Sequence, residues 1–347
     1  MTLTDGVSPT TSQITPSRGS AAGGESRLGR SLALLERFGL VIVLIGVALF
    51  FTFWPATAGV FPTASNIRTI AANESILVIA AMAVLIPLVA FRFDLSVGSV
   101  VATSSICSAK LLVEWHAPLV VGVVCGVLVG ALLGLISGFV IAYYDANSMV
   151  ITLGMSTLLT GVGAYLTGYT SILGIPQPLL DFGNESWLGL PRPVWLFVLV
   201  ALGVSALLGL TVFGRRLLSI GSNEAASRLV GMPVQRTIMI AFVCSGTLAG
   251  LAGVLLLART GSASAGFGAG YTLPALAAIF LGSTTIRPGR FTVIGTIVGV
   301  FFVAISINGL TLAGAEDWVE PTFNGAAVVI AVTAAAVLAK RRLRAAR

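Results

Sequence analysis

Ten apolar segments divide the chain, and short polar or charged stretches separate them. A helix that crosses a bilayer needs about 20 apolar residues, and most of these segments approach or exceed that length. The third and eighth are the weakest, because each is short or broken by polar residues. The segments cover residues 38–54, 75–91, 97–114, 117–143, 149–169, 194–213, 237–257, 271–286, 291–312 and 322–339. They predict an all-α polytopic membrane protein, a bundle of about ten transmembrane helices.

Composition supports a membrane protein. Hydrophobic residues make up 56% of the chain and charged residues 10%, whereas a typical soluble domain is about 25% charged. The net charge of +7 could indicate a nucleic-acid partner. However, the charges flank apolar segments and form no basic and aromatic surface, so we expect contact with lipid and none with nucleic acid.

The basic residues are distributed unevenly between the two sides of the predicted bundle. If the N-terminus is cytoplasmic, 16 of the 20 Lys and Arg residues fall on the cytoplasmic side. Only four fall at or toward the other side: Arg68, Lys110, Arg192 and Arg259. Cytoplasmic loops carry such an excess of positive charge, so we predict an even number of spans, with both termini inside and residues near 180 outside.

The longest polar interruption on the basic side is residues 221–233. Ser222 or Asn223 can cap a helix, and Glu224 suits its first turn. Gly231 and Pro233 should end it after about two turns, which is too short to cross a bilayer. This segment is either an ordinary connecting helix or a helix that docks on another protein.

A second polar interruption, Phe93–Ser99, carries Asp94, Ser96, Gly98 and Ser99. One interpretation is an N-cap, in which Asp94 starts the third span. The other is a broken helix near a transport path, since polar groups within a membrane are costly and often functional.

The fourth segment has glycine at every fourth position, at Gly122, Gly126, Gly130, Gly134 and Gly138. This spacing puts all five on one helical face, which predicts close packing against another helix. Lining of a substrate path is the alternative. Pairs with the same spacing occur in the seventh segment, at Gly246 and Gly250, and in the ninth, at Gly295 and Gly299.

The sequence contains no pattern that indicates catalysis or a bound cofactor. A phosphate-binding loop needs Gly-x4-Gly-Lys-Ser/Thr, and neither Lys110 nor Lys340 has that context. His116 has no evident nucleophile, and the three cysteines lie inside apolar segments without metal-ligand spacing. We therefore expect no enzyme, no metal and no cofactor here. If transport uses ATP, a separate protein binds it.

Four short motifs resemble those of a known family. Asn223-Glu-Ala-Ala followed by Gly231 looks like the cytoplasmic coupling loop of ABC-importer permeases. Phe93–Ser99, Met149–Gly154 and Ala275–Gly282 resemble segments of the ribose-type sugar permeases, which are related to branched-chain amino-acid permeases. The resemblance implies a permease subunit in the inner or plasma membrane of a prokaryote that imports a sugar or sugar-like polar solute.

The same resemblance implies the partners and the site. The partners would be cytoplasmic ATPase subunits, an extracytoplasmic solute-binding protein and a second permease, either a copy or a paralogue. The positions expected to contact the ATPase are Asn223, Glu224, Ala225, Ala226 and Gly231. Residues 1–37 would be a disordered cytoplasmic tail, residues 38–339 the permease domain and residues 340–347 a basic tail. A branched-chain amino-acid permease and a transporter that works alone remain the alternatives.

Overall fold

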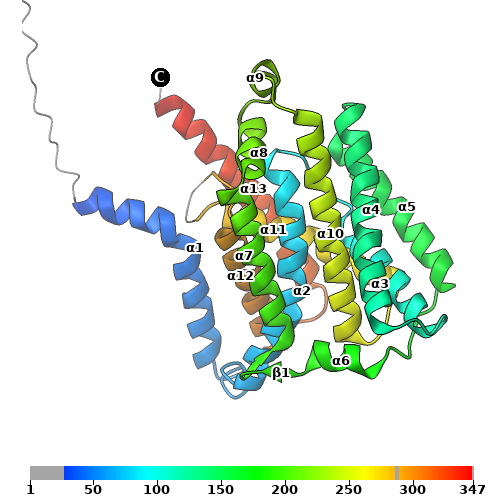
Figure 1. Ribbon diagram of the computed structural model, residues 1–347. Coiled ribbons are helices and arrows are strands. Elements are labelled where there is room, and N and C mark those ends of the chain that lie inside the picture. Colours follow the sequence, from blue (N-terminus) through cyan, green and yellow to red (C-terminus); the bar gives the residue numbers. More distant parts are fainter. Residues whose placement is uncertain (1–26, 286–288, 346–347) are drawn as a thin grey trace, which may run out of the picture.

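The computed structural model describes residues 27–285 and 289–345, and within these residues the protein is almost entirely helical (Figure 1). Each of the ten predicted apolar segments coincides with a helix. The helices are α1 (Arg27–Phe53), α2 (Ala64–Val89), α3 (Val97–Val113), α4 (Leu119–Tyr143), α5 (Ser148–Thr167), α6 (Gln177–Asn184), α7 (Arg192–Leu210), α8 (Val212–Ser222), α9 (Glu224–Leu229), α10 (Val234–Thr260), α11 (Ala269–Gly282), α12 (Val293–Leu312) and α13 (Val319–Ala345), with a 3-10 turn, η1 (Ala265–Gly268), before α11. The strands β1 (Ser186–Trp187) and β2 (Leu190–Pro191) form a small antiparallel hairpin.

The predicted fold class, an all-α polytopic membrane protein, is confirmed. Within the described part of the chain, seven helices are long and apolar enough to cross a membrane, and the apolar helices Phe38–Phe53 and Val97–Val113 are shorter. The exact count of ten spans therefore stays a prediction. Helix α1 begins at Arg27, ahead of the predicted span, and α13 continues to Ala345 into the predicted basic tail. The rest of the predicted N-terminal tail, residues 1–26, lies outside the described residues.

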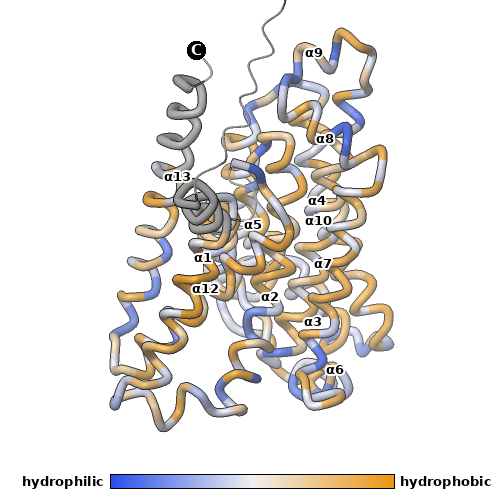
Figure 2. Tube along the Cα trace, turned by 90° about the vertical axis from the view of Figure 1, so that its left-hand side faces the viewer, coloured by the Kyte–Doolittle hydropathy of each residue, from blue (hydrophilic) through white to orange (hydrophobic). Residues whose placement is uncertain are grey.

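Polar and apolar positions separate along the axis of the bundle. Figure 2 shows hydrophobic positions through its middle and hydrophilic ones gathered at the two ends, near α9 and near α6. This is the pattern expected when a bilayer surrounds the middle and water surrounds the ends.

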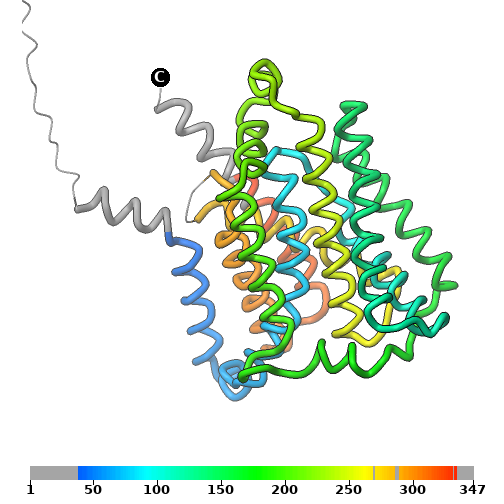
Figure 3. Tube along the Cα trace, in the orientation of Figure 1, coloured from blue at the N-terminus to red at the C-terminus, as the bar shows by residue number. Residues whose placement is uncertain are grey.

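Helices α2 and α10 form the centre of the bundle. Every residue of α2 from Ser75 to Val89 is buried. Helix α2 packs on α10, α7, α11 and α12, while α10 also packs on α3 and most extensively on α4. Figure 3 shows the result: α4 and α5 lie on one side of this central pair, and α1 and α12 on the other.

Four glycines of the α4 stripe, Gly126, Gly130, Gly134 and Gly138, face α10, whereas Gly122 faces Leu112 of α3. A Cβ atom added to Gly130 would lie far inside van der Waals distance of the Gly246 carbonyl oxygen, and one added to Gly246 would meet the Gly130 carbonyl in the same way. Gly134 faces the Phe242 carbonyl, and Gly250 faces that of Gly126. The packing interpretation of the stripe is thus confirmed, because the two backbones approach too closely for any side chain.

The ninth segment repeats this arrangement. Gly295 in α12 meets the backbone of Gly282 in α11, and Gly299 meets the Ala278 carbonyl of the same helix. Glycine pairs at this spacing therefore hold two separate helix pairs together, α4 with α10 and α11 with α12.

We expect Gly130→Ala to destabilise the protein, because its methyl group must separate α4 from α10. Overpacking of this kind costs about 1–3 kcal/mol. Gly203→Ala in α7 is the matched control, since no atom lies within 4 Å of its added Cβ. The measurement is the thermal unfolding midpoint and the yield of monodisperse protein in detergent. Equal midpoints for the two variants would contradict the packing assignment.

Candidate functional site

The short helix α9 stands at one end of the bundle (Figure 1). Asn223, which precedes it, is extended at φ −159° and ψ 100°, and its side-chain oxygen accepts the Ala226 N–H at 2.9 Å. Ser227 Oγ donates to the Asn223 carbonyl oxygen, also at 2.9 Å. After the helix, Gly231 takes φ +76°, which favours glycine because it lacks a Cβ atom. The cap is Asn223 rather than Ser222, and the predicted short helix is confirmed.

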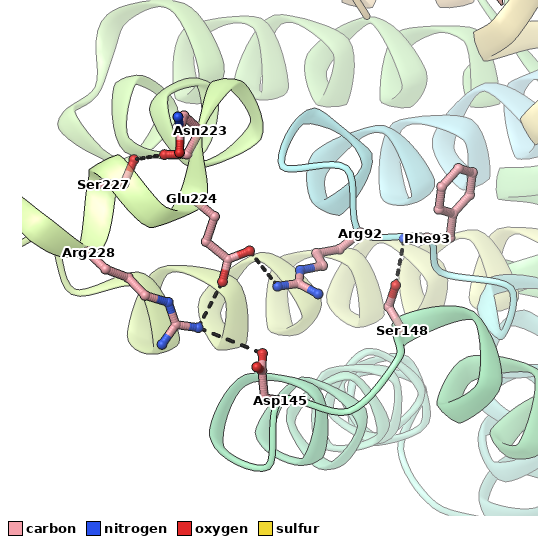
Figure 4. A network of polar contacts seen from close by, with 8 residues as sticks. All are labelled: Arg92, Phe93, Asp145, Ser148, Asn223, Glu224, Ser227 and Arg228. Atoms are coloured by element: carbon pink, nitrogen blue, oxygen red, sulfur yellow. Dashed lines mark hydrogen bonds and ion pairs between the residues drawn. The ribbon is translucent and has the colours of Figure 1, made fainter.

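Glu224 joins α9 to the rest of the protein (Figure 4). Its Oε2 accepts a hydrogen bond from Arg92 Nη2 at 2.7 Å, and its Oε1 accepts one from Arg228 Nη2 at 2.8 Å. Arg228 also lies 3.7 Å from Asp145 Oδ1, in the connection between α4 and α5. The hydrogen bond to Glu224 is the main cause that raises the pKa of Arg228. The sequence predicted Glu224 in the first turn, but its partner Arg92 is 132 residues away and was not paired with it.

The opposite side of α9 faces away from the protein. Ala225 and Ala226 are exposed, Leu229 is 88% exposed and Val230 is 72% exposed, whereas Ser227 is buried. Large exposed apolar side chains at a polar end of the molecule are typical of a surface that binds another protein. Leu229 and Val230 also belong to this surface, although they were not predicted as contact residues. Their apolar side chains directly before Gly231, in a polar segment, could have indicated it.

The polar interruption at Phe93–Ser99 is a break between two helices. Helix α2 ends at Val89 and α3 begins at Val97, and residues 92–96 between them have no regular structure. Side chains of α5 supply the missing backbone partners. Phe93 N–H donates to Ser148 Oγ at 3.1 Å, and Leu95 N–H donates to Thr152 Oγ1 at 3.0 Å. Residues 92–96 are thus an irregular connection between two helices, and their predicted place near a transport path stays a prediction.

Asp94 is buried within this break, at 3% exposure. Its Oδ1 accepts from the N–H of Ser96 at 3.1 Å and from Ser96 Oγ at 2.6 Å. Its Oδ2 accepts from Ser245 Oγ of α10 at 2.8 Å. The N-cap of α3 is Ser96 and not Asp94, which corrects the first interpretation of this segment. Asp94 instead fastens the break to the middle of α10.

Gly98 and Ser99 fasten the start of α3 to other helices. Gly98 N–H donates to Thr272 Oγ1 of α11 at 3.0 Å, and its Cα sits against the Gly268 carbonyl, where a side chain would not fit. Ser99 Oγ and Ser156 Oγ of α5 are hydrogen-bonded at 2.7 Å. The four predicted transport-path positions, Asp94, Ser96, Gly98 and Ser99, thus lie together and contact three helices. Their role in transport stays a prediction.

A polar cavity of about 440 Å³ lies elsewhere, at the end of the bundle opposite α9. Its walls come from α2, α11, α12 and α13, and its polar side chains include Glu74, Asn308, Glu320 and Asn324. None of the four predicted transport-path residues lines it. None of these four side chains was predicted as a site residue. Asn308 and Asn324 were detectable as amides inside apolar segments, where polar groups are rare.

Comparison with known proteins identifies the family. Residues 66–334 match the family described as the permease component of the branched-chain amino acid transport system. The chain is 33% identical to YphD of Escherichia coli (strain K12), a probable ABC transporter permease protein, over 90% of this chain and 93% of YphD. It is 32% identical to the ribose import permease RbsC of the same strain, over 86% of this chain and 93% of RbsC. It is also 32% identical to the L-arabinose transport system permease AraH of that strain, over 86% of this chain and 89% of AraH. No solved structure matches the chain.

The chain therefore belongs to this family of ABC-transporter permease components, which are transport subunits. Its similarity to the ribose and arabinose permeases places it with the carbohydrate permeases of that family. Together with its apolar helices, this makes it a multi-pass protein of the inner membrane.

The Arg92–Glu224 ion pair should hold α9 in place. We expect Arg92→Gln and Glu224→Gln each to raise hydrogen exchange in residues 222–231, because each removes the charge-assisted contact between α9 and the break. Glu224→Gln also removes the contact with Arg228, so the double variant should be hardly worse than Glu224→Gln alone, with a coupling of about 0.5–1 kcal/mol, since the pair is partly exposed.

Arg216→Gln is the control for this cycle, because Arg216 is an exposed arginine on the neighbouring helix α8. It should leave exchange in α9 unchanged. Additive effects of the Arg92 and Glu224 variants would mean that the contact does not position the helix.

Proposed function

We propose that the chain is the membrane subunit of an importer for a sugar or sugar-like polar solute, driven by a separate ABC ATPase that docks on α9. The observation that carries this proposal is the exposed surface of α9, formed by Ala225, Ala226, Leu229 and Val230 and supported from behind by Glu224. We refer to these four residues as the docking surface. Small side chains let a partner approach closely, and the two larger apolar ones provide contacts to bury.

The contacts around Glu224 support a route by which ATP-driven movement reaches the membrane helices. A displacement of α9 acts on Arg92 through the ion pair, and Arg92 is directly followed by the break at residues 93–96. The break is hydrogen-bonded to α5 and α10, and Gly98 just beyond it to α11. Movement at the docking surface would thus shift three helices together, as alternation between inward and outward states requires.

The distribution of basic residues supports a cytoplasmic location for α9. Arg92, Arg215, Arg216, Arg228 and Arg236 all lie on or beside α8, α9 and the start of α10. The end with α6 carries acidic and aromatic groups instead, including Asp181, Glu185 and Trp187. We assign that end to the extracytoplasmic solute-binding protein. A second permease, a copy or a paralogue, would complete the assembly.

We expect Ala226→Arg to leave the permease in the membrane but to abolish ATPase binding, because a long charged side chain fills the centre of the docking surface. Gly231→Val should weaken binding as well, because a β-branched residue is strained at φ +76°. Co-purification of the ATPase and solute-stimulated ATP hydrolysis measure both effects. Vesicle uptake of D-ribose and L-arabinose, with L-leucine as the competing candidate, tests the solute class.

Two control variants separate docking from folding. Gly231→Asn should keep the ATPase, because asparagine tolerates a left-handed backbone. Ser186→Arg adds the same charge at an exposed position in β1, at the opposite end, and should also keep it. If Ala226→Arg retains the ATPase with full stimulated hydrolysis, α9 is only a connector and the proposed coupling site is wrong.

The sidedness can be measured with two matched serines, Ser186 in β1 and Ser222 at the end of α8, which are both exposed. After Cys107, Cys125 and Cys244 are replaced by serine, Ser186→Cys should react with an impermeant maleimide in sealed cells. Ser222→Cys should react only after the cells are permeabilised. The reverse pattern would place α9 outside and exclude ATPase docking there.

A further inference from the structure

The polar cavity opposite α9 has the position and size of a solute site. It lies between the first half of α2, the last turns of α12 and the first turns of α13, with Tyr271 and Phe267 on a further side. Its volume of about 440 Å³ falls within the range of small-molecule sites, about 300–1,000 Å³. By the assignment above, this is the end at which a solute arrives.

One buried group in the wall has no partner. Asn324 is only 6% exposed, and its Oδ1 accepts no hydrogen bond from the described residues. A buried acceptor without a donor costs about 1–3 kcal/mol, so such a group is expected where a ligand supplies the donor. An apolar side chain such as leucine at position 324 would not carry this cost.

The other polar groups of the wall combine two acidic side chains with hydroxyl and amide groups that can both donate and accept. Glu74 and Glu320 line the cavity, and neither forms an ion pair with the described residues. Among the described residues, the lining contains no lysine, arginine or histidine. Arg259 is not part of the lining, and it is engaged by Asn73 Oδ1, to which its Nε donates at 3.0 Å, and by Asn184, to which its Nη1 donates. The cavity therefore offers hydrogen-bonding groups to hydroxyls, and its acidic side chains disfavour anions.

We infer that this cavity binds a neutral polyhydroxylated solute, whose hydroxyl groups form hydrogen bonds with Asn324 Oδ1 and with the carboxyl groups of Glu74 and Glu320, and that it excludes anionic sugars. The rings of Tyr271 and Phe267 supply the apolar surface on which the C–H face of a sugar ring packs. This inference rests on the proposed import function and deepens it, because it places a solute site within a single permease subunit.

The first test measures the charge preference of the cavity. Full-length protein is reconstituted in lipid nanodiscs with the three native cysteines replaced by serine and with Ile307→Cys, a lining position, as reporter. Rates of reaction with a cationic and an anionic methanethiosulfonate are compared, and their ratio cancels the reactivity of the thiol itself. We expect the ratio to exceed that at the exposed Ser186→Cys by at least about tenfold.

Charge variants then assign this preference to particular carboxylates. Glu320→Gln, and the double variant Glu74→Gln with Glu320→Gln, should lower the ratio several-fold. Glu316→Gln is the matched control, because it removes a carboxylate four residues from Glu320 that does not line the cavity, and it should leave the ratio unchanged. Equal ratios at Ile307→Cys and Ser186→Cys would overturn the inference.

The second test measures solute binding by protection of the reporter. D-ribose or L-arabinose at millimolar concentration should slow labelling of Ile307→Cys at least about threefold, whereas D-ribose 5-phosphate should not, because its phosphate meets Glu74 and Glu320. Asn324→Leu should remove the protection while the reagents still enter. Any of three results would overturn the inference: neither pentose protects, the phosphate protects equally, or only an amine such as spermidine protects.

Two further readouts separate the possible failures. The charge ratio does not depend on Asn324→Leu, so the inference stays testable if that variant fails to fold. ATPase co-purification depends on α9 and not on the cavity. A complex that retains its ATPase but lacks charge selectivity at Ile307→Cys would refute the cavity assignment alone. Failure of the unaltered protein to co-purify with an ATPase would instead refute the importer assignment.

Discussion

The structure depends on finding hydrogen-bond partners for the backbone of residues 92–96, a non-helical segment inside an apolar bundle. A helix bonds its own N–H and C=O groups, but residues 92–96 do not, and an unpaired buried backbone group costs as much as a lost hydrogen bond. Ser148 and Thr152 of α5 provide acceptors, and Asp94 binds both its own turn and Ser245 of α10. Because these hydrogen bonds form only when α5 and α10 are in place, the break helps to fix the arrangement of these helices.

The close approach of α4 and α10 is the second constraint, and it acts through the absence of side chains. The carbonyl groups of one helix lie against the glycine backbones of the other, so dispersion contacts form between main chains. Lipid tails are as apolar as leucine, so burying leucine between these helices would gain little. The glycines instead gain from packing density.

Periodicity and local chemistry were enough to predict the helices, the short helix after Asn223 and the glycine contact, because each depends on residues near one another in the chain. The partner of Glu224 could not be predicted, since six helices, α3 to α8, lie between Arg92 and Glu224 in the chain and only the fold brings the two together. Asp94 was recognised as unusual, but its bond to Ser245 depends on the tertiary packing of α10. The cavity was not predicted for the same reason: Glu74 is far in sequence from Asn308 and Asn324, and the three share a wall only in the folded bundle.

Helix α2 connects the features at the two ends of the protein. Its first half carries Glu74 in the cavity wall, and the chain just beyond its last turn carries Arg92, which holds α9. Between them α2 is buried without interruption from Ser75 to Val89, so it is packed on all sides and transmits displacement as a rigid body. In the proposed importer, a displacement at the docking surface would therefore pass along α2 and move the cavity wall relative to α11, α12 and α13. This would couple the proposed solute cavity at one end to the proposed ATPase contact at the other.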